Sequence, residues 1–319
     1  MSASLEALDP EIRGFVREVM ETSARLAGGR ALDWPRRRAI AEQVRAPWRQ
    51  AGPRMARTRD WDEPGASGGA LRLRLHLPRG VPSPSPLLVY LHGGGWSMFS
   101  IDSHDRLMRE YADAAAVAVL GIDYALSPEH VYPLALDQVV AQLRGLPARA
   151  AALGIDPSRI ALGGDSAGAN LALAAALRLR DGGGPALRGL LLNYGAFDAR
   201  ISAEAAALGT PEDMLSVEEM AVFWANYTGG DARLLEDPLV CPARARLDGL
   251  PPAQLVAAGR DVLCEQSIAM AARLREAGGE AALAIVPGMP HSFLEAMSAC
   301  RQSAQTIAGS AAWLRARLA

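Results

Sequence analysis

The sequence predicts an α/β fold in which a mostly parallel central sheet is flanked by helices. Short apolar runs, typical of strands that are buried on both faces, alternate along the chain with longer helical stretches. Because parallel strands need crossover connections, this alternation indicates one sheet with helices on both faces. The 319 residues are enough for one large α/β domain or for two smaller ones.

The expected elements follow one another regularly. Residues 71–77 alternate leucine with arginine or histidine, which is typical of a half-buried strand. A Pro- and Ser-rich loop at 78–86 separates that strand from the buried run 87–91. Further strands are expected at 116–122, 159–163, 187–193, 253–258 and 281–286, and helices at 106–115, 134–153, 167–180, 265–277 and 304–318.

Two segments interrupt the alternation. Residues 1–55 have a helical pattern with interspersed Arg and Glu, and residues from about 195 to 237 contain several large apolar side chains. We expect the two segments to form a helical cap over the carboxyl ends of the strands, where open α/β sheets bind ligands. Residues 56–319 would then hold the main α/β domain, with the second segment inserted in it. A surface insertion that contacts no site is the alternative.

Charge and composition argue against several classes of protein. A formal net charge of −2 does not suit nucleic acid or an anionic membrane surface as the main partner. Charged residues break every apolar stretch before about 18 residues, so no membrane span is expected. Glu6 and Asp9 near the start argue against a signal peptide. Because Cys241, Cys264 and Cys300 match no metal or redox spacing, we expect free thiols, no metal, and a reducing cytoplasmic location.

The segment Gly164-Asp-Ser-Ala-Gly168 matches G-x-S-x-G between an expected strand and an expected helix. In this motif a tight, strained turn exposes the serine oxygen, and the glycines leave room for the neighbouring strand and helix. The start of the helix would place the Ala167 amide beside a developing oxyanion. Ser166 is therefore the candidate nucleophile. An ordinary Gly-rich turn is the alternative.

A second glycine-rich segment, His92-Gly-Gly-Gly-Trp96, directly follows the buried run 87–91. Such a loop supplies backbone donors for a tetrahedral oxyanion, because glycine lets the chain approach the reacting carbonyl. We expect the amides of Gly94 and Gly95, together with Ala167, to form the oxyanion hole. The loop could also be a plain turn or bind phosphate, but it lacks the spacing of nucleotide-binding loops.

The general base and its acidic partner follow from chain order, which is Ser, then Asp or Glu, then His. Only His291 among the five histidines follows Ser166, so His291 is the candidate base. Asp261 is the first carboxylate after the strand at 253–258. Glu265 is the competitor, although it is expected in the first turn of the next helix, where an acidic side chain is a normal partner of the helix dipole.

Taken together, these motifs resemble those of the hormone-sensitive-lipase-like family of bacterial carboxylesterases, over roughly residues 70–319. The chain departs from the family pattern in three places. It has Ala125-Leu-Ser-Pro-Glu129 for R-L-A-P-E, Cys264 and Glu265 within D-x-L-x-D-E, and Ser292 within H-G-F. None of these departures removes a catalytic group. The motifs, in order, are His92-Gly-Gly-Gly-Trp96, Asp123-Tyr-Ala-Leu-Ser-Pro-Glu-His130, Gly164-Asp-Ser-Ala-Gly168, Asp261-Val-Leu263 and His291-Ser-Phe293.

The resemblance implies an α/β-hydrolase fold with a two-part cap, activity on esters of small molecules, no cofactor, and frequent dimers, so a homodimer is possible. It also implies acyl transfer to Ser166 followed by hydrolysis of the acyl-enzyme. Bulky side chains near the reacting carbonyl favour acetyl to butyryl groups. The expected substrate-binding residues are Trp96, Met98, Phe223, Trp224 and Tyr227.

Three other functions share this fold. Amide or formamide hydrolysis could use the same triad, since an H-G-G-x-W loop also resembles that of arylformamidases. Acyl transfer to an alcohol other than water is the second. The third, from a different class, is a non-catalytic protein that binds a small ligand, which an intact Ser, Asp and His set argues against.

Overall fold

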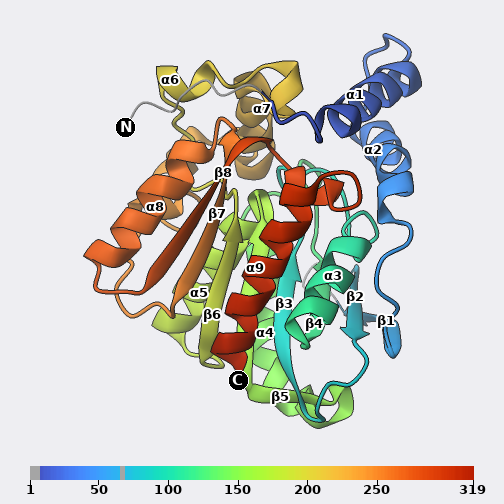
Figure 1. Ribbon diagram of the computed structural model, residues 1–319. Coiled ribbons are helices and arrows are strands. Elements are labelled where there is room, and N and C mark those ends of the chain that lie inside the picture. Colours follow the sequence, from blue (N-terminus) through green and yellow to red (C-terminus); the bar gives the residue numbers. More distant parts are fainter. Residues whose placement is uncertain (1–7, 65–68) are drawn as a thin grey trace.

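The computed structural model describes residues 8–64 and 69–319, so the first seven residues of the expected cap lie outside the described part. The strands are β1 (Arg57–Pro64), β2 (Ala70–Leu77), β3 (Ser85–Leu91), β4 (Ala118–Asp123), β5 (Ile155–Asp165), β6 (Leu187–Asn193), β7 (Ala253–Arg260) and β8 (Ala281–Pro290). In these described ranges they form one sheet in the order β1-β2-β4-β3-β5-β6-β7-β8 (Figure 1). β2 is antiparallel to both of its neighbours, and the pairs from β4 to β8 are parallel.

Helices cover both faces of the sheet, and strand β3 shows why. Leu87, Val89 and Leu91 point into one core, whereas Leu88 and Tyr90 point into the other, and all five are fully buried. The first core includes α4, α5 and α8, and the second includes α3 and α9. The predicted α/β fold with a mostly parallel sheet is thus confirmed. The helices are α1 (Arg13–Ala27), α2 (Trp34–Arg49), α3 (Asp105–Ala115), α4 (Leu134–Leu153), α5 (Ala167–Gly182), α6 (Ala203–Ala206), α7 (Val217–Thr228), α8 (Cys264–Glu276) and α9 (Arg301–Leu318).

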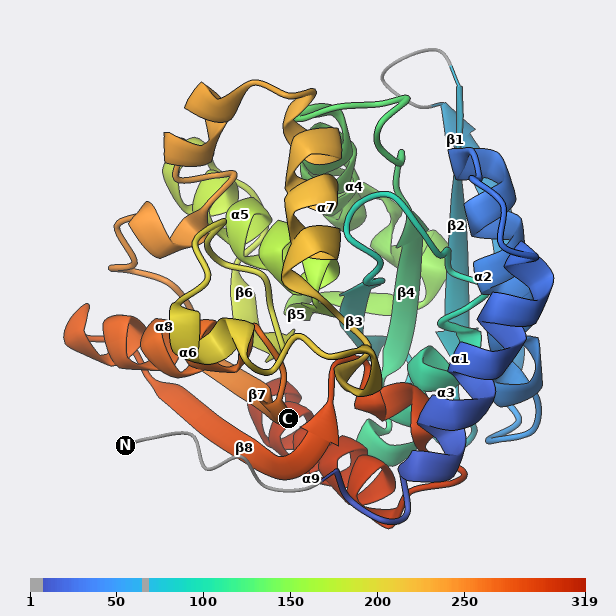
Figure 2. The ribbon, with the colours of Figure 1, turned by 90° about the horizontal axis from the view of Figure 1, so that it is seen from above.

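The two segments that broke the alternation lie at the same end of the sheet. Figure 1 shows α1, α6 and α7 beyond one end of the strands, and Figure 2 shows α7 over the sheet with α1 and α2 along its β1–β2 side. Local signals start α2 and α7: the Asp33 side chain accepts from the Arg36 amide at 2.9 Å, and Ser216 and Glu219 form a capping box on α7. No helix in the described residues is both long and apolar enough to cross a membrane.

Several strands differ from the sequence prediction in their bounds; β5, for example, begins at Ile155 and not at residue 159. β1 was not expected, because its sequence, from Arg57 to Pro64, is mostly charged. It is an edge strand with most of its side chains exposed, a position at which charge protects against edge-to-edge association. β8 continues to Pro290, beyond the expected end at residue 286, so His291 is the first residue after the strand.

Candidate active site

Ser166 occupies a strained turn between β5 and α5. Its backbone has φ 54° and ψ −120°, a conformation that costs a non-glycine residue roughly 1–3 kcal/mol. Three backbone hydrogen bonds hold the turn: the Ser166 amide donates to Asn193 O at 2.8 Å, and Ser166 O accepts from the amides of Asn170 at 3.2 Å and Ala196 at 3.4 Å. The turn points the serine oxygen into a cavity at the carboxyl end of the sheet.

The glycines on either side of the serine are required by the approach of β3. A Cβ atom on Gly164 would lie 2.4 Å from the carbonyl oxygen of Leu91, and one on Gly168 would lie 2.0 Å from the same oxygen. No side chain fits at either position unless the end of β3 moves. The G-x-S-x-G pattern thus corresponds to backbone packing against the strand that leads into the oxyanion loop.

The structure brings the three candidate catalytic residues into one hydrogen-bonded chain. His291 Nε2 lies 2.9 Å from Ser166 Oγ, and His291 Nδ1 lies 2.6 Å from Asp261 Oδ2. The other Asp261 oxygen accepts from the Leu263 amide at 2.9 Å. Glu265 lies at the start of α8, where its carboxylate accepts from Ser202 Oγ at 2.7 Å, so it is not part of this chain.

The electrostatic environment suits His291 as a base. Burial by itself lowers the pKa of His291, but the charge and the hydrogen bond of Asp261 raise it more, so the pKa lies above its ordinary value. Asp261 is fully buried and orients the ring so that Nε2 faces the serine. The arrangement allows His291 to accept the Ser166 proton and to be stabilised as it becomes charged.

Gly94 and Gly95 face the same cavity as Ser166. Their φ angles are 111° and 57°, and a Cβ atom would lie 2.2 Å from Met98 O at Gly94 and 2.2 Å from the Phe223 ring at Gly95. Within the described ranges, neither amide donates a hydrogen bond to the protein. Ala167 is the first residue of α5, so its amide has no partner in that helix.

The cavity has a volume of about 680 Å³ and contains Ser166 and His291. Residues of α1 and α2 form one part of its wall, and residues 209–223 of the inserted segment form another. The remaining wall comes from the oxyanion loop, including Met98 and Phe99. Both expected parts of the cap therefore contribute to the cavity that the serine faces.

The expected substrate-binding residues fall into two groups. Met98 and Phe223 line the cavity, whereas Trp96, Trp224 and Tyr227 do not. Trp96 has φ 55°, a left-handed conformation that turns its indole away from the cavity and onto α7. There it stacks on Tyr227 with ring centroids 4.4 Å apart and contacts Trp224 at 4.5 Å. These three side chains pack the oxyanion loop against the cap and do not form the cavity wall.

Sequence reasoning did not single out the contact between the cap and the base. Asp213, at the end of the short turn η1 (Pro211–Asp213), is fully buried and accepts from Arg260 Nε at 2.7 Å. Its backbone oxygen accepts from the His291 amide at 3.1 Å. An aspartate in a loop, such as Asp213, is usually interpreted as a turn residue. The only signal in the sequence was its partner Arg260, a charged residue directly before Asp261.

Arg38 of α2 joins the N-terminal part of the cap to the oxyanion loop. Its Nε donates to Ser97 O at 2.7 Å, its Nη2 donates to Ser127 O at 2.8 Å, and it forms an ion pair with Glu129. Helix α2 and the inserted segment thus both contact segments that carry candidate catalytic groups.

A buried ion pair lies next to the strained turn at Ser166. Asp165, directly before Ser166, accepts from Tyr90 Oη at 2.9 Å and lies 3.2 Å from His104 Nε2. Burial raises the pKa of Asp165, but His104, Tyr90 and His92 together lower it more, so the pKa lies below its ordinary value. The pair keeps a charged group next to the nucleophile without exposing it to the cavity.

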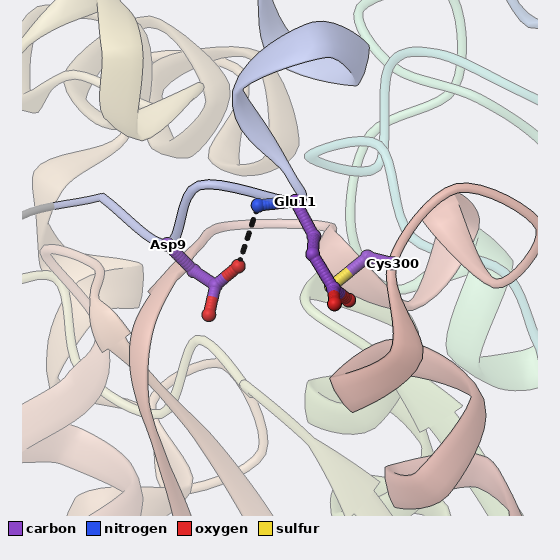
Figure 3. A group of neighbouring side chains, drawn as sticks. All are labelled: Asp9, Glu11 and Cys300. Carbon is purple, nitrogen blue, oxygen red and sulfur yellow. Dashed lines mark hydrogen bonds between the residues drawn. The ribbon is translucent and has the colours of Figure 1, made fainter.

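One group of acidic and thiol side chains in the described residues lies close enough together to consider as a metal site. It consists of Asp9, Glu11 and Cys300 (Figure 3). The carboxylates already bind protein donors: Glu11 accepts from the Arg301 amide and its guanidinium, and Asp9 accepts from the Glu11 amide and Gln302. They attach the N-terminal segment to the start of α9, so we assign no metal to them.

The fold and the arrangement of serine, histidine and aspartate define an enzyme of the α/β-hydrolase class. A family model described as alpha/beta hydrolase fold matches residues 88–295, and the chain belongs to that family. A curated relative, carboxylesterase NlhH of Mycobacterium tuberculosis, is 38% identical over 226 residues, which is 70% of each chain. The resemblance to the hormone-sensitive-lipase-like carboxylesterases is thereby confirmed, and the protein is a carboxylic ester hydrolase.

Solved structures match almost the whole chain. An α/β-hydrolase from the metagenome of Lake Arreo, Spain, matches with a TM-score of 0.89 and 31% identity, covering 97% of this chain and 98% of the other. A hyperthermophilic esterase from the archaeon Pyrobaculum calidifontis matches with a TM-score of 0.89 and 26% identity, covering 98% and 99%. The likeness therefore extends beyond the matched family region to the N-terminal helices α1 and α2.

Proposed function

We propose that the protein hydrolyses short-chain esters of small molecules, acetyl to butyryl, through an acyl-enzyme on Ser166. The observation that carries this proposal is the hydrogen-bonded chain from Ser166 through His291 to Asp261 at the cavity. The amides of Gly94, Gly95 and Ala167 beside it are the proposed oxyanion hole. The cap consists of α1, α2 and residues from about 195 to 237.

In the proposed mechanism, His291 Nε2 takes the Ser166 proton while Oγ attacks the ester carbonyl carbon. The carbonyl oxygen becomes an oxyanion, which the loop amides stabilise. The intermediate collapses, the bond to the alcohol breaks, and His291 gives its proton to the leaving alkoxide. Water then attacks the acyl-enzyme by the same steps and releases the carboxylic acid, which restores Ser166.

The walls beside the oxyanion glycines support the preference for short acyl groups. The Phe223 ring lies against Gly95, and the Phe99 ring lies within 2.8 Å of where a Cβ on Gly94 would be. Bulky rings so close to the reacting carbonyl leave room for few acyl carbons. Each methylene that fits contributes up to about 0.8 kcal/mol, and one that clashes costs more. The rest of the 680 Å³ cavity is available to a larger alcohol part.

A panel of p-nitrophenyl esters of increasing acyl length tests this proposal. We expect kcat/KM to peak between acetyl and butyryl and to fall steeply by octanoyl. A preference for decanoyl or longer esters would refute the narrow acyl site while leaving the triad proposal intact. An anilide matched to the best ester, and product analysis with added alcohols, would detect amide hydrolysis and acyl transfer.

The proposal also includes a cytoplasmic location and a possible homodimer. Cys241, Cys264 and Cys300 are free, buried thiols, which supports a reducing cytoplasmic location. The homodimer that the resemblance allows stays a prediction, and light scattering during size-exclusion chromatography would measure the oligomeric state.

A further inference from the structure

Arg45 of α2 is a buried cation on the wall of the cavity that contains Ser166 and His291. Its side chain is only 9% exposed. Arg45 Nε donates to the carboxylate of Glu295 in the short turn η4 (Phe293–Ala296), and the guanidinium lies over the Phe99 ring, 5.1 Å from its centroid. These two contacts hold the guanidinium in one place.

The two Nη groups of Arg45 are free to bind a ligand. Among the hydrogen bonds of the described residues, Nε is the only Arg45 atom that donates. Because Arg45 lines the cavity, its Nη groups can donate to water or to an oxygen of a bound substrate. Much of the cavity wall is apolar: Met20, Met98, Phe99, Met214, Met220 and Phe223. A few fixed donors in an apolar cavity are what usually orient a small-molecule ligand.

The position of Arg45 indicates which part of a substrate it would meet. The Phe99 ring lies against Gly94 and also beneath the Arg45 guanidinium. One aromatic ring therefore separates Arg45 from the proposed oxyanion hole. An acceptor bound by Arg45 must lie several bonds away from the ester carbonyl.

The surrounding charges favour an uncharged acceptor. Glu295 already neutralises Arg45, so the pair offers a charged carboxylate little net attraction to offset the loss of its hydration. Glu218 and Glu219 add negative charge on the cap side of the same cavity. An uncharged oxygen can accept from the Nη groups without either penalty.

We infer that Arg45 determines specificity for esters that carry an uncharged oxygen acceptor, such as a ketone or ether oxygen, several bonds from the ester carbonyl. This inference deepens the proposed function and rests on ester hydrolysis at Ser166. A site built to hydrogen-bond a substrate group discriminates strongly against an analogue that lacks it, because the buried donors are then left unpaired. We expect a preference of about tenfold or more in kcat/KM.

Matched ester pairs test the inference on either side of the ester bond. For the alcohol part, 5-oxohexyl acetate is compared with hexyl acetate; for the acyl part, p-nitrophenyl 4-oxopentanoate is compared with the pentanoate. Each rate is divided by that of hydroxide-catalysed hydrolysis to remove intrinsic reactivity. The series that shows the preference identifies the part of the substrate that Arg45 meets.

Two variants and one control establish whether Arg45 is responsible. Arg45→Met combined with Glu295→Gln removes the ion pair as a unit, which avoids a lone buried charge, and should bring the ratio close to one. Arg45→Lys keeps the charge but loses the planar fork, so it should also lower the ratio. Arg49→Met, one turn along α2 and outside the cavity, should keep the wild-type ratio.

The inference would be overturned if the wild-type enzyme hydrolysed each ketone ester and its matched ester at equal normalised rates in both series. A preference for the ketone ester that persists in the double variant would also overturn it. Faster hydrolysis of 6-acetoxyhexanoate than of the ketone ester would also overturn it, because the site would then select carboxylates. If no ester of either kind were hydrolysed, the proposed function itself would fail, which is a distinct result.

Discussion

Replacing Gly168 by alanine should disable the site without unfolding the protein. The added Cβ would lie 2.0 Å from Leu91 O and 2.6 Å from His92 O, and both obstacles are backbone atoms. Ordinary contact begins near 3.4 Å, so the end of β3 must move away from α5 by roughly 1 Å or more. That end of β3 carries the glycine loop of the proposed oxyanion hole.

The expected magnitudes differ between stability and activity. Overpacking of this kind costs about 1–3 kcal/mol, which a domain stable by about 5–15 kcal/mol tolerates. A displacement of about 1 Å at the reacting groups, in contrast, can lower the rate by about 10²-fold. We therefore expect Gly168→Ala to remain folded and to lose about 10²-fold in kcat/KM on p-nitrophenyl acetate.

Thermal unfolding and steady-state kinetics on the same preparation separate these effects. Gly309→Ala is the matched control, because Gly309 is an exposed glycine in α9 whose Cβ would meet nothing within 4 Å. The control should keep full activity and gain up to about 1 kcal/mol of stability. If Gly168→Ala kept more than half of the wild-type kcat/KM, the inference that Gly168 must pack against the end of β3 would be incorrect.

Three further predictions concern the site. Asp261→Asn should lower kcat by about 10⁴-fold, whereas Glu265→Gln should have little effect; a larger loss at Glu265 would reverse the assignment. Because the base acts when neutral and the pKa of His291 is raised, kcat/KM should rise with pH through an apparent pKa above about 6.5. Asp261→Asn should shift this limb to lower pH, and a limb that does not move would contradict the coupling. Cys264→Ser should keep most of the activity, because burial raises the pKa of that thiol to about 12; iodoacetamide inactivation that the substitution abolishes would contradict this prediction.

Most of the fold could be predicted because its core strands and helices have strong periodic patterns. The buried run that became β3 and the amphipathic or apolar stretches that became α4 and α5 begin within two residues of the expected positions. β1 could not be predicted, because an exposed edge strand is stabilised by pairing with β2 and not by a pattern in its own side chains.

The candidate catalytic residues could be proposed from the sequence because their order and local motifs are constrained by backbone geometry. A strained turn needs glycines at fixed spacing, and the base must come from a later strand end. The directions in which the side chains of the cap point were harder to predict from the sequence. In α7, Phe223 faces the cavity, but the next residue, Trp224, is rotated by about 100° and faces the core. The Trp96 indole points away from the cavity because its backbone is left-handed, and sequence spacing does not reveal a backbone conformation of this kind.

The contacts between the cap and the candidate active site also could not be predicted from the sequence. Asp213, Arg38 and Arg45 lie far along the chain from the groups that they touch, and each is a charged residue in a segment where exposed charge is common. Their roles arise only when the cap folds over the sheet and buries them against specific partners.

We propose Ser166 as the nucleophile of an acyl-enzyme mechanism. Peptide mapping by mass spectrometry after reaction with a fluorophosphonate tests it most directly, together with kcat for Ser166→Ala. We expect one adduct, on Ser166, that is absent in the alanine variant, and a loss of about 10³-fold or more in kcat. An adduct on another residue, or an alanine variant that keeps a tenth of the wild-type activity, would contradict it.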